Sequence, residues 1–304
     1  MIVPHLTQVT SPYFNSKTIG IGNALFQIFA AYGLAKKYGH SFNNYNLLQY
    51  LIAIKKFNYK HDSTIFRNLK IWKTIPNSIC NKVNEGHYKY ELLDENVCNI
   101  VKNTTDSQVL LLIGYFQSHL YFDEYYNEIK QLLSPDENSI KLIRNKYIHL
   151  FDENNINISL HFRINWGKNI SYNFDFYYEA IEYIINRTNS SKNIIINIFA
   201  DDIELVKNRF SSNYKTFYFE DNEDYIDMWS MTLCHHNILS HSTLCWWGAY
   251  LNYHTEKIVV YPEDVCRLVG GDLFDDKVIL ERKTQHYKKE WIALNTKNVL
   301  YISI

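Results

Sequence analysis

This sequence has few glycines, prolines and arginines, and its positive and negative charges nearly cancel. The formal net charge is −1, which argues against a general nucleic-acid binder and against a polybasic membrane anchor, because both carry an excess of positive charge. Glycine and proline number 10 and 5, and 7 of the 31 basic residues are arginine. We attribute these shortages to coding bias in an AT-rich genome. Each arginine that does stand near a motif is therefore a stronger candidate for a specific anion contact.

Cysteine and long apolar runs are also limiting. The five cysteines form no C-x-x-C pair and their number is odd, so neither a zinc site nor a disulfide framework is indicated. No stretch approaches 18 apolar residues, and the first residues show no charged region followed by an apolar core. We expect no transmembrane segment, no signal peptide, reduced thiols and a cytoplasmic location.

What the sequence has is apolar and aromatic content, at 46% and 16% of 304 residues. This is enough for real cores, and the length favours two domains. From residue 155 onward, apolar strands and amphipathic helices alternate, which predicts a parallel sheet covered on both faces. The expected strands are 155–162, 193–199, 216–219, 237–240 and 257–260, and the expected helices are 175–186, 203–210, 225–234 and 246–253.

The first half is harder to interpret. Residues 2–6 and 108–113 have the pattern of strands, and helices are expected from about 20 to 38 and from about 120 to 133. The segment 41–107 shows no clear pattern, and its aromatic residues fit sugar stacking and core packing equally well. No internal repeat is found.

Ligands of parallel α/β sheets bind at the carboxyl ends of the strands, so residues that follow strands are candidates for chemistry. Arg163 follows the expected strand 155–162 and is suited to a phosphate, with a structural ion pair as the equal alternative. Ser242 and Thr243 lie between a strand end and a helix start, where hydroxyls and free amides can hold an anion. Gly20 and Gly22 open a helix in a similar way, although an ordinary loop explains them as well.

The acidic and histidine clusters do not indicate a metal. Asp201 and Asp202 are adjacent, and the D-x-D spacing occurs only from Asp202 to Glu204, where a helix should start. Helix capping is the favoured interpretation. His235, His236 and His241 lack a consistent ligand geometry, so we predict no metal site.

Four segments, in this order along the chain, carry a resemblance to a known family. They resemble G-x-G-N-x-x-F-Q, G-Y-F-Q-S, F-S-D-D and H-N-I…S-S-F-S-W-W-G-A-W-L-N of the α-1,2-fucosyltransferases, glycosyltransferase family 11. In this sequence they are Gly20-Ile21-Gly22-Asn23-Ala24-Leu25-Phe26-Gln27, Gly114-Tyr115-Phe116-Gln117-Ser118, Phe199-Ala200-Asp201-Asp202 and the stretch from Cys234 to Asn252. The last segment is highly specific.

The resemblance implies an α/β fold of GT-B type, with two Rossmann-like domains whose parallel sheets face a central cleft. Residues 1–152 would form the acceptor-side domain and 153–304 the domain that binds the nucleotide sugar. It further implies inverting transfer of L-fucose from GDP-L-fucose to a glycan acceptor. The nucleotide sugar is then a co-substrate, and neither a cofactor nor an obligatory metal is expected.

The resemblance also implies roles for individual residues. Arg163 would bind the donor diphosphate and act in catalysis, and Asp227 would recognise the guanine edge. Asp175 is the candidate general base, with helix capping as the favoured alternative. The further expected nucleotide contacts are His161, Ser242, Thr243, Gly20, Gly22, Asn23 and Asp202.

One departure from the family pattern leaves the donor open. The family has His-x-Arg-Arg-x-Asp, whereas Ile164 and Trp166 stand here at the second arginine and the acidic position. A transferase for another nucleotide sugar, with a rhamnose or hexosamine donor, is the first alternative, and an inactive glycan- or nucleotide-binding homologue is the second. A redox enzyme is disfavoured because no G-x-G-x-x-G follows a strand. The acceptor, the linkage and the oligomeric state stay open.

Overall fold

The structure is a computed structural model that describes residues 1–6, 20–44, 47, 64–70, 80–86, 92–105, 107–164, 174–188, 190–263 and 276–294. The chain forms two compact units. Unit 1 comprises Met1–Pro135 and Phe274–Lys289, and unit 2 comprises Asp136–Leu273 and Glu290–Ile304. Each unit is built on a parallel sheet, which confirms the predicted α/β class. The roles assigned to the two halves of the sequence stay predictions.

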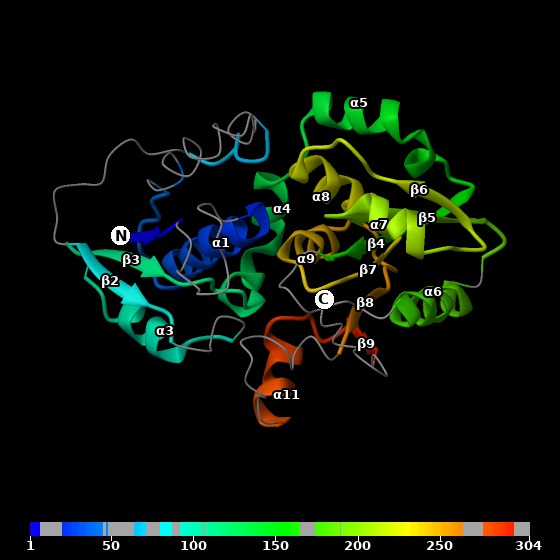
Figure 1. The fold of residues 1–304 in the computed structure, drawn as a ribbon. Helices are drawn as coiled ribbons and strands as arrows, with labels where there is room; N and C mark the ends of the chain where they lie inside the picture. The colour runs from blue at the N-terminus through cyan, green and yellow to red at the C-terminus, as the bar shows by residue number, and fades with distance from the viewer. Residues whose placement is uncertain are drawn as a thin grey trace. The chain divides into compact units, whose positions relative to one another are not determined.

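Unit 2 contains a six-stranded sheet in which every pairing is parallel. Its order, β6-β5-β4-β7-β8-β9, can be followed in Figure 1. Numbered from its first strand, this is the order 3-2-1-4-5-6 of a dinucleotide-binding fold. The strands are β4 (Asn155–Phe162), β5 (Asn193–Ala200), β6 (Lys215–Tyr218), β7 (His236–Ile238), β8 (Val259–Pro262) and β9 (Ile292–Leu294).

From β4 onward, the helices of unit 2 follow the predicted alternation, and a helix and a 3₁₀ turn that were not predicted precede it. They are α5 (Glu137–Lys146), the 3₁₀ turn η4 (Ile148–Phe151), α6 (Phe174–Thr188), α7 (Ile203–Arg209), α8 (Asp224–Thr232) and α9 (Thr243–Tyr250). Helix α6 covers one face of the sheet, where Ile158, Leu160 and Phe162 of β4 pack against Tyr177 and Ile181. This is the main apolar core of the unit.

The other face of β4 is polar and yet buried. Asn155, Asn157, Ser159 and His161 alternate with the apolar residues, and all eight residues of the strand are buried. Their side chains are satisfied by neighbours: the Asn197 amide donates to Asn157 Oδ1 at 3.1 Å, and the Asn237 amide donates to Ser159 Oγ at 2.7 Å. Buried polar groups persist where they find partners of this kind.

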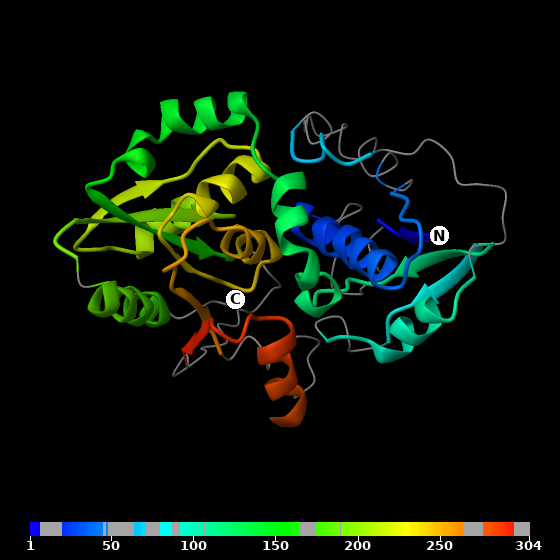
Figure 2. The same cartoon turned by 180° about the vertical axis from the view of Figure 1, so that it is seen from behind.

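Unit 1 has a three-stranded parallel sheet of order β1-β3-β2. The strands are β1 (Ile2–Pro4), β2 (Cys80–Asn84) and β3 (Val109–Ile113), and Phe42 extends the sheet through a parallel bridge to Ile2. Helix α1 (Ile21–Lys37) lies beside this sheet (Figure 2) and buries most of its residues, so it is a core helix. The other elements are α3 (Glu95–Lys102), η2 (His119–Tyr121), η3 (Asp123–Tyr125), α4 (Tyr126–Leu132) and α11 (Asp276–Gln285).

No helix within the described ranges combines the length and the apolar character that crossing a bilayer requires.

Candidate functional site

The order of the unit 2 sheet fixes where a ligand should bind. The first two chain connections run from β4 to β5 and then to β6 on one side, whereas β7, β8 and β9 lie on the other side of β4. The carboxyl ends of β4 and β7 therefore flank a topological switch point, where α/β sheets hold their ligands. Strand β4 ends with His161 and Phe162 and is followed by Arg163 and Ile164, and the residues after β7 lead through Ser240 to Thr243.

His161 joins the two strands at this point. Its Nδ1 atom lies 2.7 Å from the hydroxyl oxygen of Ser240, and the Tyr177 hydroxyl donates to its carbonyl oxygen at 3.0 Å. The imidazole is buried. Burial, aided by the nearby positive charge of Arg163, lowers its pKa to about 3. His161 is therefore a neutral hydrogen-bonding group at physiological pH.

Arg163 emerges from the end of β4 next to the end of β5. Its Nη1 atom lies 3.1 Å from Oδ2 of Asp201, and 38% of its side chain is exposed. The same carboxylate accepts a hydrogen bond from the backbone N–H of Ile164 at 2.7 Å. The Ile164 side chain packs against the apolar core of the unit. The structure is therefore compatible with both interpretations of Arg163. The arginine forms a structural ion pair, and its exposed donors are still available to a phosphate.

The hydroxyl pair lies at the start of α9. Ser242 is the N-cap residue, and its side-chain oxygen accepts from the Leu244 N–H at 3.3 Å. Thr243 is the first residue of the helix, and both side chains are half-buried. The free amides and the positive end of the helix dipole make such a terminus favourable for an anion.

Asp227 lies in the first turn of α8, which packs against α9. The side-chain amide of Asn222 donates to its Oδ1 at 2.7 Å and also to the Tyr147 hydroxyl at 2.8 Å. Burial raises the pKa of the Asp227 carboxyl to about 7, against the opposing effect of the Asn222 hydrogen bond. Asp227 is thus a half-buried carboxyl.

A glycine sets the approach of α8 to α9. A Cβ atom built on Gly248 would lie 2.7 Å from Cβ of Met231. Gly248, which follows Trp246 and Trp247, therefore lets these two helices pack closely. Through this packing it holds the helix that carries Asp227 against the helix that begins at Thr243.

The other two acidic candidates, Asp202 and Asp175, lie at helix N-termini and stabilise those helices. Asp202 is the N-cap of α7, where its Oδ1 accepts from the Leu205 N–H at 3.0 Å, as the favoured interpretation expects. Asp175 is exposed and is the second residue of α6, so it lies inside the first turn and is not the cap residue. At that place a carboxylate favours the helix through its dipole.

The histidines that follow α8 also have structural partners. The Nδ1 atoms of His235 and His236 accept backbone N–H bonds from Asn157 at 3.1 Å and from Ile258 at 3.0 Å. Within the described ranges, no group of three or more histidine, cysteine or acidic residues is arranged to hold a metal ion.

The remaining candidates lie in unit 1. Gly20 is the N-cap of α1, Gly22 lies in its first turn, and the side chain of Asn23 accepts from the Gln117 amide at 2.9 Å. Gln27 donates to the Gly114 carbonyl at 2.7 Å. The structure thus joins the first two motif segments, residues 20–27 and 114–118, within one unit.

Glu85, which follows β2 in the segment that could not be interpreted, was not among the predicted site residues. Its carboxyl accepts the backbone N–H groups of Tyr115 and Phe116 at 2.8 and 3.1 Å, and burial raises its pKa to about 8. Phe116 has a φ of 51°, a strained value for a side chain of this size. Glu85 therefore holds the turn of the 114–118 segment. The acidic residue between a strand and a turn was the signal that could have pointed to it.

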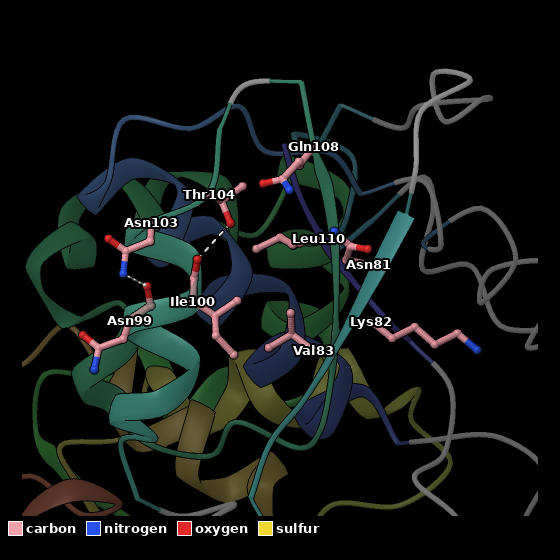
Figure 3. A pocket seen from close by; sticks show the side chains of 9 residues that line it. All are labelled: Asn81, Lys82, Val83, Asn99, Ile100, Asn103, Thr104, Gln108 and Leu110. Carbon is pink, nitrogen blue, oxygen red and sulfur yellow. Dashed lines mark hydrogen bonds between the residues drawn. The ribbon is translucent and has the colours of Figure 1, made fainter.

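A cavity of about 440 Å³ lies in unit 1, between α3 and the strands β2 and β3 (Figure 3). Its lining contains none of the predicted site residues. Lys82 is its one charged side chain, and the others are amide, hydroxyl or apolar groups. It therefore lacks a carboxylate, an arginine and a helix N-terminus of the kind found at the switch point of unit 2.

A sequence model of Glycosyl transferase family 11 matches residues 87–295. The chain belongs to this family. The match includes the segments 114–118, 199–202 and 234–252, and it leaves Gly20 to Gln27 outside. Membership of family 11 establishes the protein as a fucosyltransferase-like glycosyltransferase, as the resemblance implied.

Two Escherichia coli proteins are similar to this family 11 chain over most of its length. The O-antigen biosynthesis glycosyltransferase WbnK is 28% identical over 290 aligned residues, covering 80% of this chain and 91% of the relative. An alpha-1,2-colitosyltransferase is 24% identical over 273 residues, covering 80% and 88%.

Solved structures show a weak likeness. A mutant of Arabidopsis thaliana FUT1 in complex with GDP has a TM-score of 0.48 at 9% identity, covering 86% of this chain and 70% of that one. Fucosyltransferase NodZ from Bradyrhizobium has a TM-score of 0.46 at 10% identity, covering 75% and 89%.

Proposed function

We propose that this family 11 enzyme transfers L-fucose from GDP-L-fucose to a glycan hydroxyl, with inversion and without an obligatory metal. The observation that supports the proposal most is the gathering of His161, Arg163 and the start of α9 at the switch point of the unit 2 sheet. These are the groups that a nucleoside diphosphate requires: a cation, hydroxyls and free helix amides.

The diphosphate is the leaving group of this reaction. When the bond from C1 of the sugar to the phosphate oxygen breaks, the electron pair stays on the diphosphate and positive charge develops on the sugar ring. Arg163 and the hydroxyls of Ser242 and Thr243 stabilise the departing negative charge. Groups that are fixed before the reaction are the most effective for this purpose.

The guanine base is the proposed partner of Asp227. A carboxylate accepts hydrogen bonds from the N–H groups on the edge of guanine, which uracil and thymine do not present in the same pattern. Asp227 is half-buried and its Oδ1 is already oriented by Asn222. Because this hydrogen bond already fixes the orientation of the carboxylate, the carboxylate loses less conformational entropy when a base binds.

The acceptor hydroxyl attacks C1 from the face opposite the diphosphate and gives up its proton. His161 is a poor base for that proton, because burial lowers the pKa of its imidazole to about 3. Asp175 is exposed on the first turn of α6 and is the proposed base. His161 instead contributes a neutral ring whose Nδ1 is bound to Ser240.

A different deoxysugar on a nucleoside diphosphate is the second candidate donor. Two observations favour it: one relative is named as a colitosyltransferase, and Ile164 replaces the second arginine of the family pattern. The Ile164 side chain packs on the core and offers no charge to the donor.

The experiment that tests the proposal measures GDP release from GDP-L-fucose, in the presence of EDTA, with lactose as a galactoside acceptor. Arg163→Ala is compared with Arg209→Ala, an exposed arginine in the last turn of α7 of the same unit. We expect Arg163→Ala to lose turnover while keeping its circular dichroism spectrum, and Arg209→Ala to retain turnover. Normal turnover in Arg163→Ala would overturn the assignment of the diphosphate site.

A further inference from the structure

Asp201 is bound to two consecutive residues after β4, and the proposed function gives it no role. One carboxylate oxygen lies 3.1 Å from the Arg163 guanidinium, and the other accepts the Ile164 N–H at 2.7 Å. The carboxylate thus fixes both the side chain of residue 163 and the main chain of residue 164. Its own side chain is 17% exposed.

The position of Asp201 is itself well determined. It directly follows β5, whose last residue, Ala200, pairs with Phe162 at the end of β4. The next residue, Asp202, caps α7 through the Leu205 N–H. A parallel ladder on one side and a capped helix on the other therefore hold the backbone of Asp201. Its carboxylate is a rigid support for the residues of the neighbouring strand.

The ion pair leaves most of the guanidinium available. Asp201 contacts Nη1, and within the described part of the chain no second residue is bound to the Arg163 side chain. An arginine carries five N–H donors in a planar fork, so the donors on Nε and Nη2 can still bind a phosphate. An arginine held at one corner loses less freedom when it binds than one that moves freely in solvent.

The isoleucine at position 164 explains why Arg163 needs to be held in place by Asp201. The residue that could have supplied a second charge packs on the core, and its backbone is tied to the same carboxylate. Arg163 is therefore the one arginine of the His-x-Arg segment, and its orientation matters more than it would beside a second arginine.

We propose that Asp201 is a positioning residue, which orients Arg163 toward the diphosphate of the donor. This inference rests on the proposed function, because it assumes that Arg163 binds the diphosphate. The carboxylate acts through Arg163 and does not itself touch the donor.

Asp201→Asn separates this role from a purely structural one. The asparagine oxygen can still accept the Ile164 N–H, so the loop keeps its hydrogen bond while the charge beside Arg163 is lost. Two probes are titrated: GDP, which carries the diphosphate, and guanosine, which does not. We expect Asp201→Asn to weaken GDP binding about 5- to 10-fold and to leave guanosine binding unchanged, since only the phosphate contact depends on Arg163.

Two further variants complete the test. Asp201→Ala also removes the acceptor for Ile164, so it should disturb the loop and weaken both probes. Arg163→Ala should weaken GDP more than Asp201→Asn does, again without an effect on guanosine. If Arg163→Ala weakens GDP but Asp201→Asn does not, the role of Asp201 is overturned and the proposed function stands.

The other outcomes are equally decisive. Tighter GDP binding by Asp201→Asn would mean that the carboxylate competes with the diphosphate, which contradicts positioning. Unchanged GDP binding by Arg163→Ala would overturn both the diphosphate assignment and the inference built on it. If the wild-type protein binds UDP in place of GDP, the proposed donor is wrong, and the same comparison with UDP and uridine decides the role of Asp201.

Discussion

The Nδ1 atom of His161 and the hydroxyl oxygen of Ser240 lie 2.7 Å apart. His161 lies at the end of β4 and Ser240 follows β7, the two neighbouring strands between which the order of the unit 2 sheet reverses. This hydrogen bond ties the segment that carries Arg163 to the loop that leads into Ser242. A buried side-chain contact therefore links the two anion-binding elements of the proposed site, in addition to the backbone pairing of β4 with β7.

Replacing Ser240 with alanine should destabilise unit 2. The change leaves Nδ1 of the buried imidazole without its partner, which costs about 1–3 kcal/mol. Urea unfolding measures the loss, and Ser190→Ala, at an exposed position, should stay within about 0.5 kcal/mol of wild type. Equal stability of Ser240→Ala and wild type would show that water replaces the serine hydroxyl without cost.

Donor binding should depend on pH through Asp227. Because the pKa of this carboxyl is raised to about 7, it is ionised above pH 7 and protonated below, and only the ionised form accepts both guanine N–H groups. The affinity for GDP-L-fucose should therefore fall as the pH drops from 8 to 6. GDP-L-fucose is the appropriate ligand because its diphosphate is a diester and does not titrate in this range.

Asp227→Asn provides the control for that titration. Its affinity should be lower at pH 8 and nearly constant from pH 8 to 6, because no carboxylate remains to be protonated. The same pH dependence in this variant would place the titrating group elsewhere.

Gly248→Ala should separate α8 from α9. The added Cβ would lie 2.7 Å from Cβ of Met231, so the helices must move apart, at a cost of about 1–3 kcal/mol. Gly20→Ala is the matched control, since a Cβ there meets nothing within 4 Å. Thermal unfolding should show a clear loss for the first variant and a small one for the second. The opposite ranking would contradict the close packing of these helices.

The buried histidines predict a loss of stability in acid. Burial lowers the pKa of His236 to about 4, below the ordinary value of 6.5, so the unfolded chain binds the proton more readily than the folded one. The stabilising contribution is complete above pH 6.5 and is lost as the pH falls from 6.5 to about 4. It amounts to about 3 kcal/mol at most.

His236→Asn isolates this contribution, because Glu85 and Asp227 have raised pKa values and act in the opposite direction. An asparagine oxygen can still accept the Ile258 N–H that His236 Nδ1 accepts. Relative to this variant, wild type should lose stability in urea as the pH decreases from 6.5 to 4. A constant difference across that range would refute the assignment.

The sequence predicted unit 2 better than unit 1, for a physical reason. Strand β5 is buried from Ile195 to Phe199, and its apolar run from Ile194 to Ala200 is interrupted only by Asn197, so it was readily predicted. Strand β4 was predicted with the bounds that the structure shows. The helix expected from 120 to 133 is instead two 3₁₀ turns followed by α4, because local turns interrupt it at Tyr121 to Tyr125. Helices α3 and α5 were missed, although Asp94 and Asp136 cap them and were visible as start signals.

The site was predictable only in part. Residues at or just after strand ends could be found from the chain alone, and this placed His161, Arg163, Ser242 and Thr243 near one edge of the sheet. The pairing of Arg163 with Asp201 depends on the register between β4 and β5, which no local pattern encodes. The support of the 114–118 turn by Glu85 is likewise a contact between distant parts of the chain.

The most direct test of the central claim is a calorimetric titration of the purified protein, without metal, with GDP-L-fucose, GDP-mannose, UDP-GlcNAc and a dTDP-deoxysugar. Selective binding of GDP-L-fucose is the predicted result, and it would show that one arginine in the His-x-Arg segment suffices. Binding of only a UDP or dTDP sugar would contradict the account, because Asp227 could then not be the group that selects guanine.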